Sequence, residues 1–151
     1  VMIGPGTGIA PMRALLQERE EQGNKKNTNS TNILYFGCQS IKKDYIYRGE
    51  LESFQERKTL TQLELAFSRD QRQKVYVQHL LQRQDDASSL LANLDQGAHV
   101  YVCGATNMGT DVMEAITTII QKGKKMSKSG ADNYLKELQN NGRYVQELWT
   151  A

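Results

Sequence analysis

The sequence has little of what several classes of protein require. Cys38 and Cys103 are its only cysteines, and there are only two histidines. These residues are too few and too scattered for a disulfide scaffold or a zinc site. We therefore expect a reducing compartment. No run approaches the roughly 20 apolar residues of a membrane-spanning helix, and no basic-then-apolar leader opens the chain. The 19 basic and 17 acidic residues nearly balance, which argues against nucleic-acid binding through bulk charge. These absences predict a soluble chain whose anion sites are local.

The length of 151 residues is that of one ordinary domain, and two independent cores are not expected. Hydrophobic residues make up 38% of the chain, enough for one core but not for a membrane protein. The sequence opens on Val1 inside an apolar run rather than on methionine. We interpret it as part of a longer protein with residues missing upstream.

The pattern of apolar residues alternates between strands and helices. Strands are predicted where β-branched and aromatic residues cluster, at 1–3, 32–36, 63–67, 99–103 and 144–149. Helices are predicted from Pro11 to Gly23 and at 47–57, 77–94, 107–121 and 131–138. The helix at 77–94 can be broken near Asp85. The polar run 24–32 is predicted to be a surface loop. This alternation predicts an α/β fold, a three-layer α/β/α sandwich with a five-stranded parallel sheet. Ligands of such sheets bind beyond the carboxyl ends of the strands.

A glycine-rich turn, GPGTGIAP at 4–11, follows the first predicted strand. Its three glycines have no Cβ, so backbone N–H groups can approach a ligand closely. The positive end of the following helix points to the same place, which favours a phosphate or diphosphate. The turn is not a Walker loop and departs from the GxGxxG spacing. A glycine turn without any ligand is the alternative.

The ends of the second and third strands bear on which nucleotide such a turn holds. The second strand ends in FGCQ at 36–39, with no carboxylate for the adenosine ribose hydroxyls that NAD-binding folds hold. The third runs into Ser68 and Arg69, with Lys74 soon after, and this combination suits a phosphate dianion. Tyr76 adds a face for adenine. From these residues alone an ordinary solvated loop explains the pattern at least as well, unless it lies beside a diphosphate cradle.

Cys103 closes the fourth predicted strand. If the strand order is 3-2-1-4-5, the loop after Cys103 and the glycine turn flank the point where the order reverses, and Cys103 faces the far end of a ligand held by the turn. A buried thiol is the alternative. A disulfide with Cys38 is not expected, because two strand spacings separate the Cα atoms by roughly 9 to 10 Å, beyond the limit near 7 Å.

Five motifs occur in an order that resembles the NADP(H)-binding lobe of ferredoxin-NADP reductase-like enzymes: GPGTGIAP, YFGC, SRDQ followed by KVYVQH, YVCG followed by NM, and GRYVQELW. SRD, KVYVQ and a terminal aromatic together resemble the diflavin reductases of that family, which pass electrons from NADPH through FAD and FMN to an acceptor. DYIYR at 44–48 and LTQLELAFSRD are most similar to the branch that reduces cytochromes P-450. Methionine synthase reductase and the sulfite reductase flavoprotein are the next most similar.

The resemblance implies a set of cofactor-binding residues: Gly6, Thr7, Gly8, Ser68, Arg69, Lys74, Tyr76, Gln78, Met108 and Asp111. The first three belong to the pyrophosphate turn, and the next three to the 2′-phosphate. Tyr76 and Gln78 are implied at the adenosine end, while Met108 and Asp111 fall near the nicotinamide half.

Three further residues are implied in catalysis. Cys103 would lie beside the nicotinamide C4, and Trp149 would cover the flavin ring and move aside for the nicotinamide. Glu147 stands where the family usually has Asp and is one methylene longer, which weakens its implied role in handling a proton. The segment 104–108 is one residue shorter than the corresponding family loop and lacks both of its charges.

The resemblance also implies the rest of the enzyme. An FAD-binding barrel, an FMN domain and any membrane anchor would lie upstream of Val1, the acceptor would be a haem protein such as a cytochrome P-450, and the whole protein would sit at the cytoplasmic face of the endoplasmic reticulum. This chain alone would bind NADP(H) without turnover. A nucleotide-binding module without redox chemistry is the alternative, but it would need no aromatic residue such as Trp149 at its carboxyl end.

Overall fold

The computed structural model describes residues 1–23 and 30–150. Its five strands are β1 (Met2–Ile3), β2 (Ile33–Cys38), β3 (Gln62–Phe67), β4 (Val100–Ala105) and β5 (Tyr144–Trp149). They form one sheet in the order β3-β2-β1-β4-β5, and every neighbouring pair is parallel. The predicted five-stranded parallel sheet is therefore confirmed, and its order is the one under which the glycine turn and the loop after Cys103 were expected to flank the reversal point. Residues 24–29 of the predicted surface loop lie outside the described residues.

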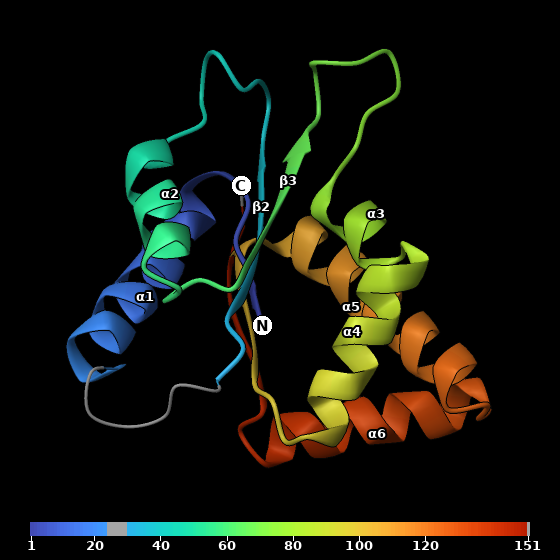
Figure 1. Ribbon diagram of the computed structural model, residues 1–151. Coiled ribbons are helices and arrows are strands. Elements are labelled where there is room, and N and C mark those ends of the chain that lie inside the picture. Colours follow the sequence, from blue (N-terminus) through green and yellow to red (C-terminus); the bar gives the residue numbers. More distant parts are fainter. Residues whose placement is uncertain (24–29, 151) are drawn as a thin grey trace.

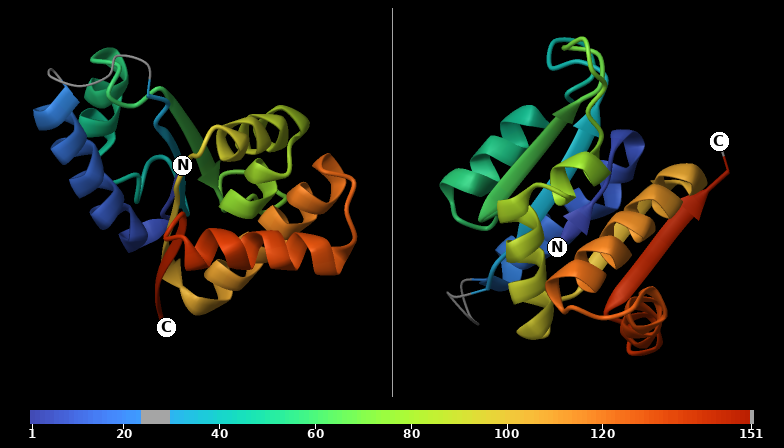
Figure 2. Two further views of the ribbon diagram at one scale, coloured as in Figure 1. Left: turned by 90° about the horizontal axis from the view of Figure 1, so that it is seen from below. Right: turned by 90° about the vertical axis from the view of Figure 1, so that its right-hand side faces the viewer.

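Helices cover both faces of the sheet, which confirms the three-layer sandwich (Figure 2). One layer contains α1 (Ile9–Gly23) and α2 (Arg48–Glu56). The other contains α3 (Val77–Leu81), α4 (Gln84–Asp95), α5 (Thr106–Gly123) and α6 (Lys128–Asn140). A short 3-10 turn, η1 (Gly6–Gly8), leads into α1. No helix in the described part of the chain is long and apolar enough to cross a bilayer.

Several helix ends lie a few residues from the predicted positions, and the break allowed near Asp85 is present. The first helix starts at Ile9 rather than after Pro11, because a proline in the first helical turn replaces an N–H group that has no intrahelical partner. The predicted helix 77–94 is two helices that meet at an extended Arg83, and the break comes before Asp85. Asp85 then lies in the first turn of α4, where the helix dipole favours a carboxylate.

The core consists of one apolar cluster on each face of the sheet. All six residues of β2 are buried, with Leu34 and Phe36 in the cluster below α1 and α2, and Tyr35 in the cluster on the opposite face. A central strand covered on both sides reads as a continuous apolar run rather than an alternating one. Cys38 and Cys103 are both buried free thiols, as expected from their separation across the sheet.

Candidate functional site

The glycine turn after β1 lies at the point where the strand order reverses, at the carboxyl edge of the sheet (Figure 1). A Cβ on Gly8 would come within 2.1 Å of the Cys103 carbonyl oxygen, so this glycine lets the turn pack directly against the end of β4. Gly6 differs, because its φ is +57° and a Cβ there would meet nothing within 4 Å. Gly8 thus serves packing inside the fold, whereas exposed Gly6 and Thr7 present the turn to the outside.

The turn has the features of an anion cradle. The Gly8 N–H donates to the Pro5 carbonyl at 3.0 Å, which closes the turn in front of α1. The first N–H groups of a helix have no intrahelical acceptor, and the dipole of the 15-residue α1 adds partial positive charge at the same end. A diphosphate is the kind of ligand that this end of a helix binds.

The loop after β3 carries Ser68, Arg69 and Lys74 at the same edge of the sheet. The Ser68 N–H donates to the Cys38 carbonyl at 2.9 Å, and the Arg69 N–H donates to the Gln39 carbonyl at 2.8 Å. The pairing of β2 with β3 therefore continues past the ends of both strands. Arg69 and Lys74 are exposed, and neither forms an ion pair with another described residue. Both cations are available to an anionic ligand.

Two aspartates organise this pair of loops, and sequence reasoning missed both. Asp44 accepts the N–H groups of Gln39 at 2.8 Å and Ser40 at 2.7 Å, and Asp70 accepts the Ile41 N–H at 2.7 Å. These bonds from backbone N–H groups hold the pKa of both carboxyls below the ordinary value. An isolated aspartate in a polar loop carries no signal for such a role, because Asp70 meets Ile41 only through the folded sheet.

Two residues assigned to opposite ends of the ligand lie against each other. The Gln78 amide nitrogen donates to Asp111 at 3.1 Å, joining the start of α3 to the second turn of α5. The other amide atom of Gln78, Oε1, is buried without a hydrogen-bond partner in the described part of the chain. This hydrogen bond brings a residue implied at the adenosine end against one implied near the nicotinamide half, and both assignments stay predictions.

Tyr76 and Met108 occupy different surroundings. Tyr76 precedes α3 with 41% of its surface exposed, so one face of its ring is open to a planar ligand. The Tyr76 N–H donates to His79 Nδ1 at 3.1 Å, so this histidine caps the start of α3. Met108 is half-buried, and its methyl group lies 2.3 Å from where a Gly104 Cβ would be. Glycine at 104 therefore allows α5 to begin directly over the end of β4.

The three residues implied in catalysis lie together on β4 and β5. Cys103 pairs in register with Glu147, and Ala105 pairs with Trp149, so Cys103, Glu147 and Trp149 share one face of the sheet. Cys103 is 4% exposed, and burial, with the nearby Glu147 carboxylate, raises the pKa of its thiol. Trp149 is 40% exposed at the carboxyl end of β5. The structure therefore places a protonated thiol, a carboxylate and an exposed indole beside the glycine turn.

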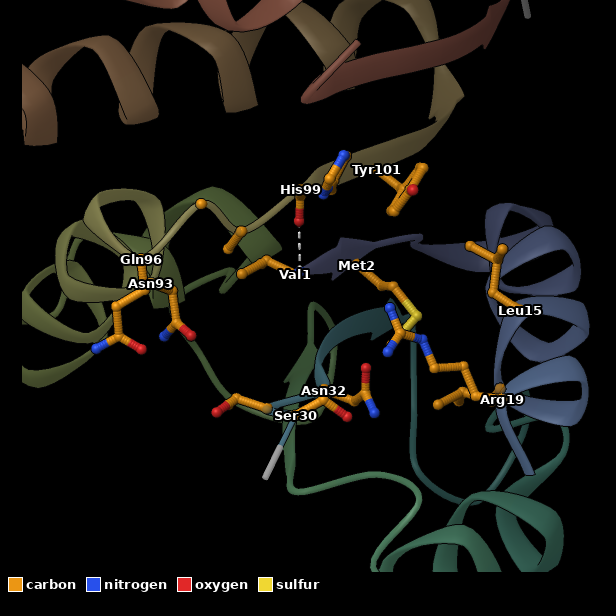
Figure 3. Close-up of a pocket in the computed structure, with 14 residues that line it drawn as sticks. Val1, Met2, Leu15, Arg19, Ser30, Asn32, Asn93, Gln96, His99 and Tyr101 are labelled. Carbon is orange, nitrogen blue, oxygen red and sulfur yellow. Dashed lines mark hydrogen bonds between the residues drawn. The ribbon is translucent and has the colours of Figure 1, made fainter. Parts of the chain in front are cut away.

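Two hollows of the described structure lie away from the glycine turn. A pocket of about 300 Å³ lies at the opposite edge, among residues that include Arg19, Asn32 and His99 (Figure 3). A second hollow, of about 560 Å³, lies between α5 and α6. The residues assigned to nucleotide binding and catalysis lie outside both hollows.

Comparison with known proteins agrees with this geometry. Residues 2–114 match the family model described as the oxidoreductase NAD-binding domain. The chain is 44% identical to the NADPH–cytochrome P450 reductase of Sus scrofa, 46% to that of Cavia porcellus and 42% to that of Drosophila melanogaster, each over 99% of the chain. It spans 22% of the length of each of these relatives. The chain belongs to the oxidoreductase NAD-binding domain family.

Proposed function

We propose that the chain is the NADP(H)-binding domain of a diflavin reductase of the NADPH–cytochrome P450 reductase type. The observation that carries the proposal is the position of Arg69 and Lys74, two exposed cations that form no ion pair with a described residue, at the same sheet edge as the open Gly6–Thr7 turn. A nucleotide with one phosphate group on its ribose and a diphosphate between its halves matches these two anion sites.

The residues at the edge fit NADP(H) by the chemistry of their donors. The turn offers backbone N–H groups to the diphosphate, while Ser68, Arg69 and Lys74 offer a hydroxyl, a guanidinium and an ammonium to the 2′-phosphate. The exposed ring of Tyr76 provides a stacking surface for adenine. The segment 36–39 at the end of β2 contains no acidic residue that could hold the free ribose of NAD(H). The two carboxylates that fold against this end, those of Asp44 and Asp70, accept the N–H groups of Gln39, Ser40 and Ile41.

Bound NADPH supplies the hydride, and FAD elsewhere in the longer protein accepts it. Cys103 is buried and the pKa of its thiol is raised. In this proposal it packs beside the reacting carbon of the nicotinamide as a neutral thiol. Glu147, on the neighbouring strand, is exposed and in register with Cys103, so its carboxyl group lies on the same face of the sheet as the thiol. The exposed indole of Trp149 provides a flat surface that can cover a flavin ring and move away when nicotinamide binds.

The partners follow from the same proposal. FAD- and FMN-binding domains of the same polypeptide receive the electrons, and a haem protein such as a cytochrome P-450 is the final acceptor. The relatives at 42–46% identity are named NADPH–cytochrome P450 reductases, which supports the choice of a cytochrome P-450 as acceptor. A location at the cytoplasmic face of the endoplasmic reticulum membrane belongs to this proposal and concerns the longer protein.

Calorimetric titration of the chain with NADP⁺, 2′,5′-ADP and NAD⁺ tests the function. We expect NADP⁺ and 2′,5′-ADP to bind at least tenfold more tightly than NAD⁺, because a charge-assisted phosphate contact contributes roughly 1.5 to 3 kcal/mol. Equal affinity for NADP⁺ and NAD⁺ would contradict the assignment of the loop after β3. The absence of binding by all three ligands would contradict the function as a whole.

A further inference from the structure

We propose that Asp70 is a positioning residue for recognition of the 2′-phosphate: its carboxylate ties the loop after β3 to the loop after β2 and so holds Arg69 in place. This inference rests on the proposed binding of NADP(H). It assigns Asp70 no contact with the ligand.

Three consecutive N–H groups after β2 donate to aspartate carboxylates. Gln39 and Ser40 donate to Asp44, which belongs to their own loop, whereas Ile41 donates to Asp70, which lies 29 residues further along the chain. Asp44 therefore forms its hydrogen bonds within the first loop. Asp70 joins that loop to the one that carries the proposed phosphate ligands.

The tie completes a short ladder of hydrogen bonds between the two loops. The N–H groups of Ser68 and Arg69 donate to carbonyls at the end of β2, and the next residue, Asp70, reaches the Ile41 N–H at 2.7 Å with its side chain. Three successive residues of the second loop are thus bonded to the first. A backbone fixed before the ligand arrives lowers the entropy cost of ordering the long Arg69 side chain on a phosphate.

The negative charge of Asp70 lowers the affinity for a phosphate, and the hydrogen bond to Ile41 must offset this loss. A carboxylate adjacent to Arg69 repels the phosphate dianion that Arg69 is proposed to bind. The Ile41 N–H and the Ser40 hydroxyl hold the pKa of Asp70 below its ordinary value, and Lys42 contributes in the same direction, so the residue is ionised at neutral pH. The carboxylate thus acts on affinity in two opposite ways, through repulsion and through the tie.

Two substitutions separate these effects. Asp70→Asn removes the charge and retains an acceptor of the same shape for Ile41, so NADP⁺ should bind as tightly as to the unmodified chain or more tightly. Asp70→Ala removes both charge and acceptor, and NADP⁺ should bind about threefold to tenfold more weakly than to Asp70→Asn, the range for one hydrogen bond. The affinity for NAD⁺, which has no 2′-phosphate, should be the same in both variants.

Calorimetry with NADP⁺ and NAD⁺ supplies the affinities, and amide hydrogen exchange supplies an independent readout without nucleotide. In Asp70→Ala the amides of Ile41 and Arg69 should exchange faster than in Asp70→Asn, while the amide of buried Leu34 exchanges equally in both and shows that the fold is intact. Equal NADP⁺ affinity in the two variants, or unchanged exchange at Ile41 and Arg69, would overturn the proposal. A failure of the NADP(H) function would instead show in the unmodified chain, as equal affinity for NADP⁺ and NAD⁺.

Discussion

The Thr106 hydroxyl donates a hydrogen bond of 3.0 Å to the carbonyl oxygen of Trp149. The bond joins the first residue of α5 to the last residue of β5, and it is additional to the backbone pairing of Ala105 with Trp149. The backbone of Trp149 is therefore held at the site while its indole stays exposed. Under the proposed function, in which the indole covers a flavin and then moves, the Thr106 bond would keep the backbone of Trp149 fixed.

Removing that bond should loosen the end of β5. Trp149 is the only tryptophan of the chain, so its fluorescence reports this place alone. In Thr106→Val we expect lower fluorescence anisotropy and faster quenching by acrylamide, because a bond worth about 0.5 to 1.5 kcal/mol is lost. Thr106→Ser retains the hydroxyl and should behave as the unmodified chain does. Identical quenching in Thr106→Val and Thr106→Ser would show that the bond does not restrain Trp149.

Gly8→Ala should destabilise the fold by about 1 to 3 kcal/mol or more, since the added methyl group would enter the backbone of β4 at the Cys103 carbonyl. The matched control is Gly49→Ala in α2, where a Cβ meets nothing within 4 Å and helix propensity favours alanine by about 0.5 to 1 kcal/mol. Urea denaturation of both variants measures the difference. A Gly8→Ala variant as stable as Gly49→Ala would refute the packing role given to Gly8.

Both cysteine thiols should resist alkylation in the folded chain. Burial and the Asp44 carboxylate raise the pKa of Cys38 to about 11, and burial with Glu147 raises the pKa of Cys103. The reactive thiolate is therefore scarce at pH 7, and the rate with iodoacetamide should still be rising at pH 10. Mass spectrometry of native and urea-unfolded samples compares the rates at each site. If Cys103 were labelled faster in the folded chain than in the unfolded chain at pH 7, its thiol would be activated and not a neutral packing group.

Tyr35→Phe should destabilise the chain by about 1 to 3 kcal/mol at neutral pH. The Tyr35 hydroxyl donates to Asp86 at 2.8 Å inside the core, and the substitution leaves that buried carboxylate oxygen without its donor. Tyr134→Phe is the control, because the Tyr134 hydroxyl has no hydrogen bond to a described residue. Urea denaturation near pH 7 should separate the two variants, and equal stability would contradict the importance of the buried bond.

The same tyrosine predicts how stability depends on alkaline pH. Burial and Asp86 raise the pKa of Tyr35 above its ordinary value near 10. Above pH 10 the unfolded chain releases this proton while the folded chain retains it, so the contribution is complete below pH 10 and is lost as the pH rises further. Tyr35→Phe should make the alkaline loss of stability less steep. An unchanged slope would mean that Tyr35 does not ionise on unfolding.

Much of the fold could be predicted from the sequence because its signals are local. The apolar run of β2 and the glycine turn after β1 are each recognisable from a few neighbouring residues. The alternation of strands with helices then restricts the possible topologies. The order of the strands entered the sequence analysis only as a condition, and the structure meets it, with the glycine turn beside Cys103 at the reversal point.

The parts that could not be predicted depend on contacts between distant segments. The ties of Asp70 to Ile41 and of Gln78 to Asp111 join residues about 30 apart, and neither leaves a periodic or compositional trace. The same holds for Gly8, whose neighbour on β4 lies 95 positions later, so the sequence suggested ligand approach where the structure shows packing.

The nucleotide affinities of Arg69→Ala test the central claim most directly, with Arg72→Ala as the control that removes an equal charge from the same loop. Arg69 is exposed, so its loss should leave the fold intact and remove a charge-assisted contact worth roughly 1.5 to 3 kcal/mol. Calorimetry should show NADP⁺ bound about tenfold to a hundredfold more weakly by Arg69→Ala, with NAD⁺ nearly unchanged and Arg72→Ala close to the unmodified chain. Equal losses for NADP⁺ and NAD⁺ in Arg69→Ala would contradict the account, because this loop would then not recognise the 2′-phosphate.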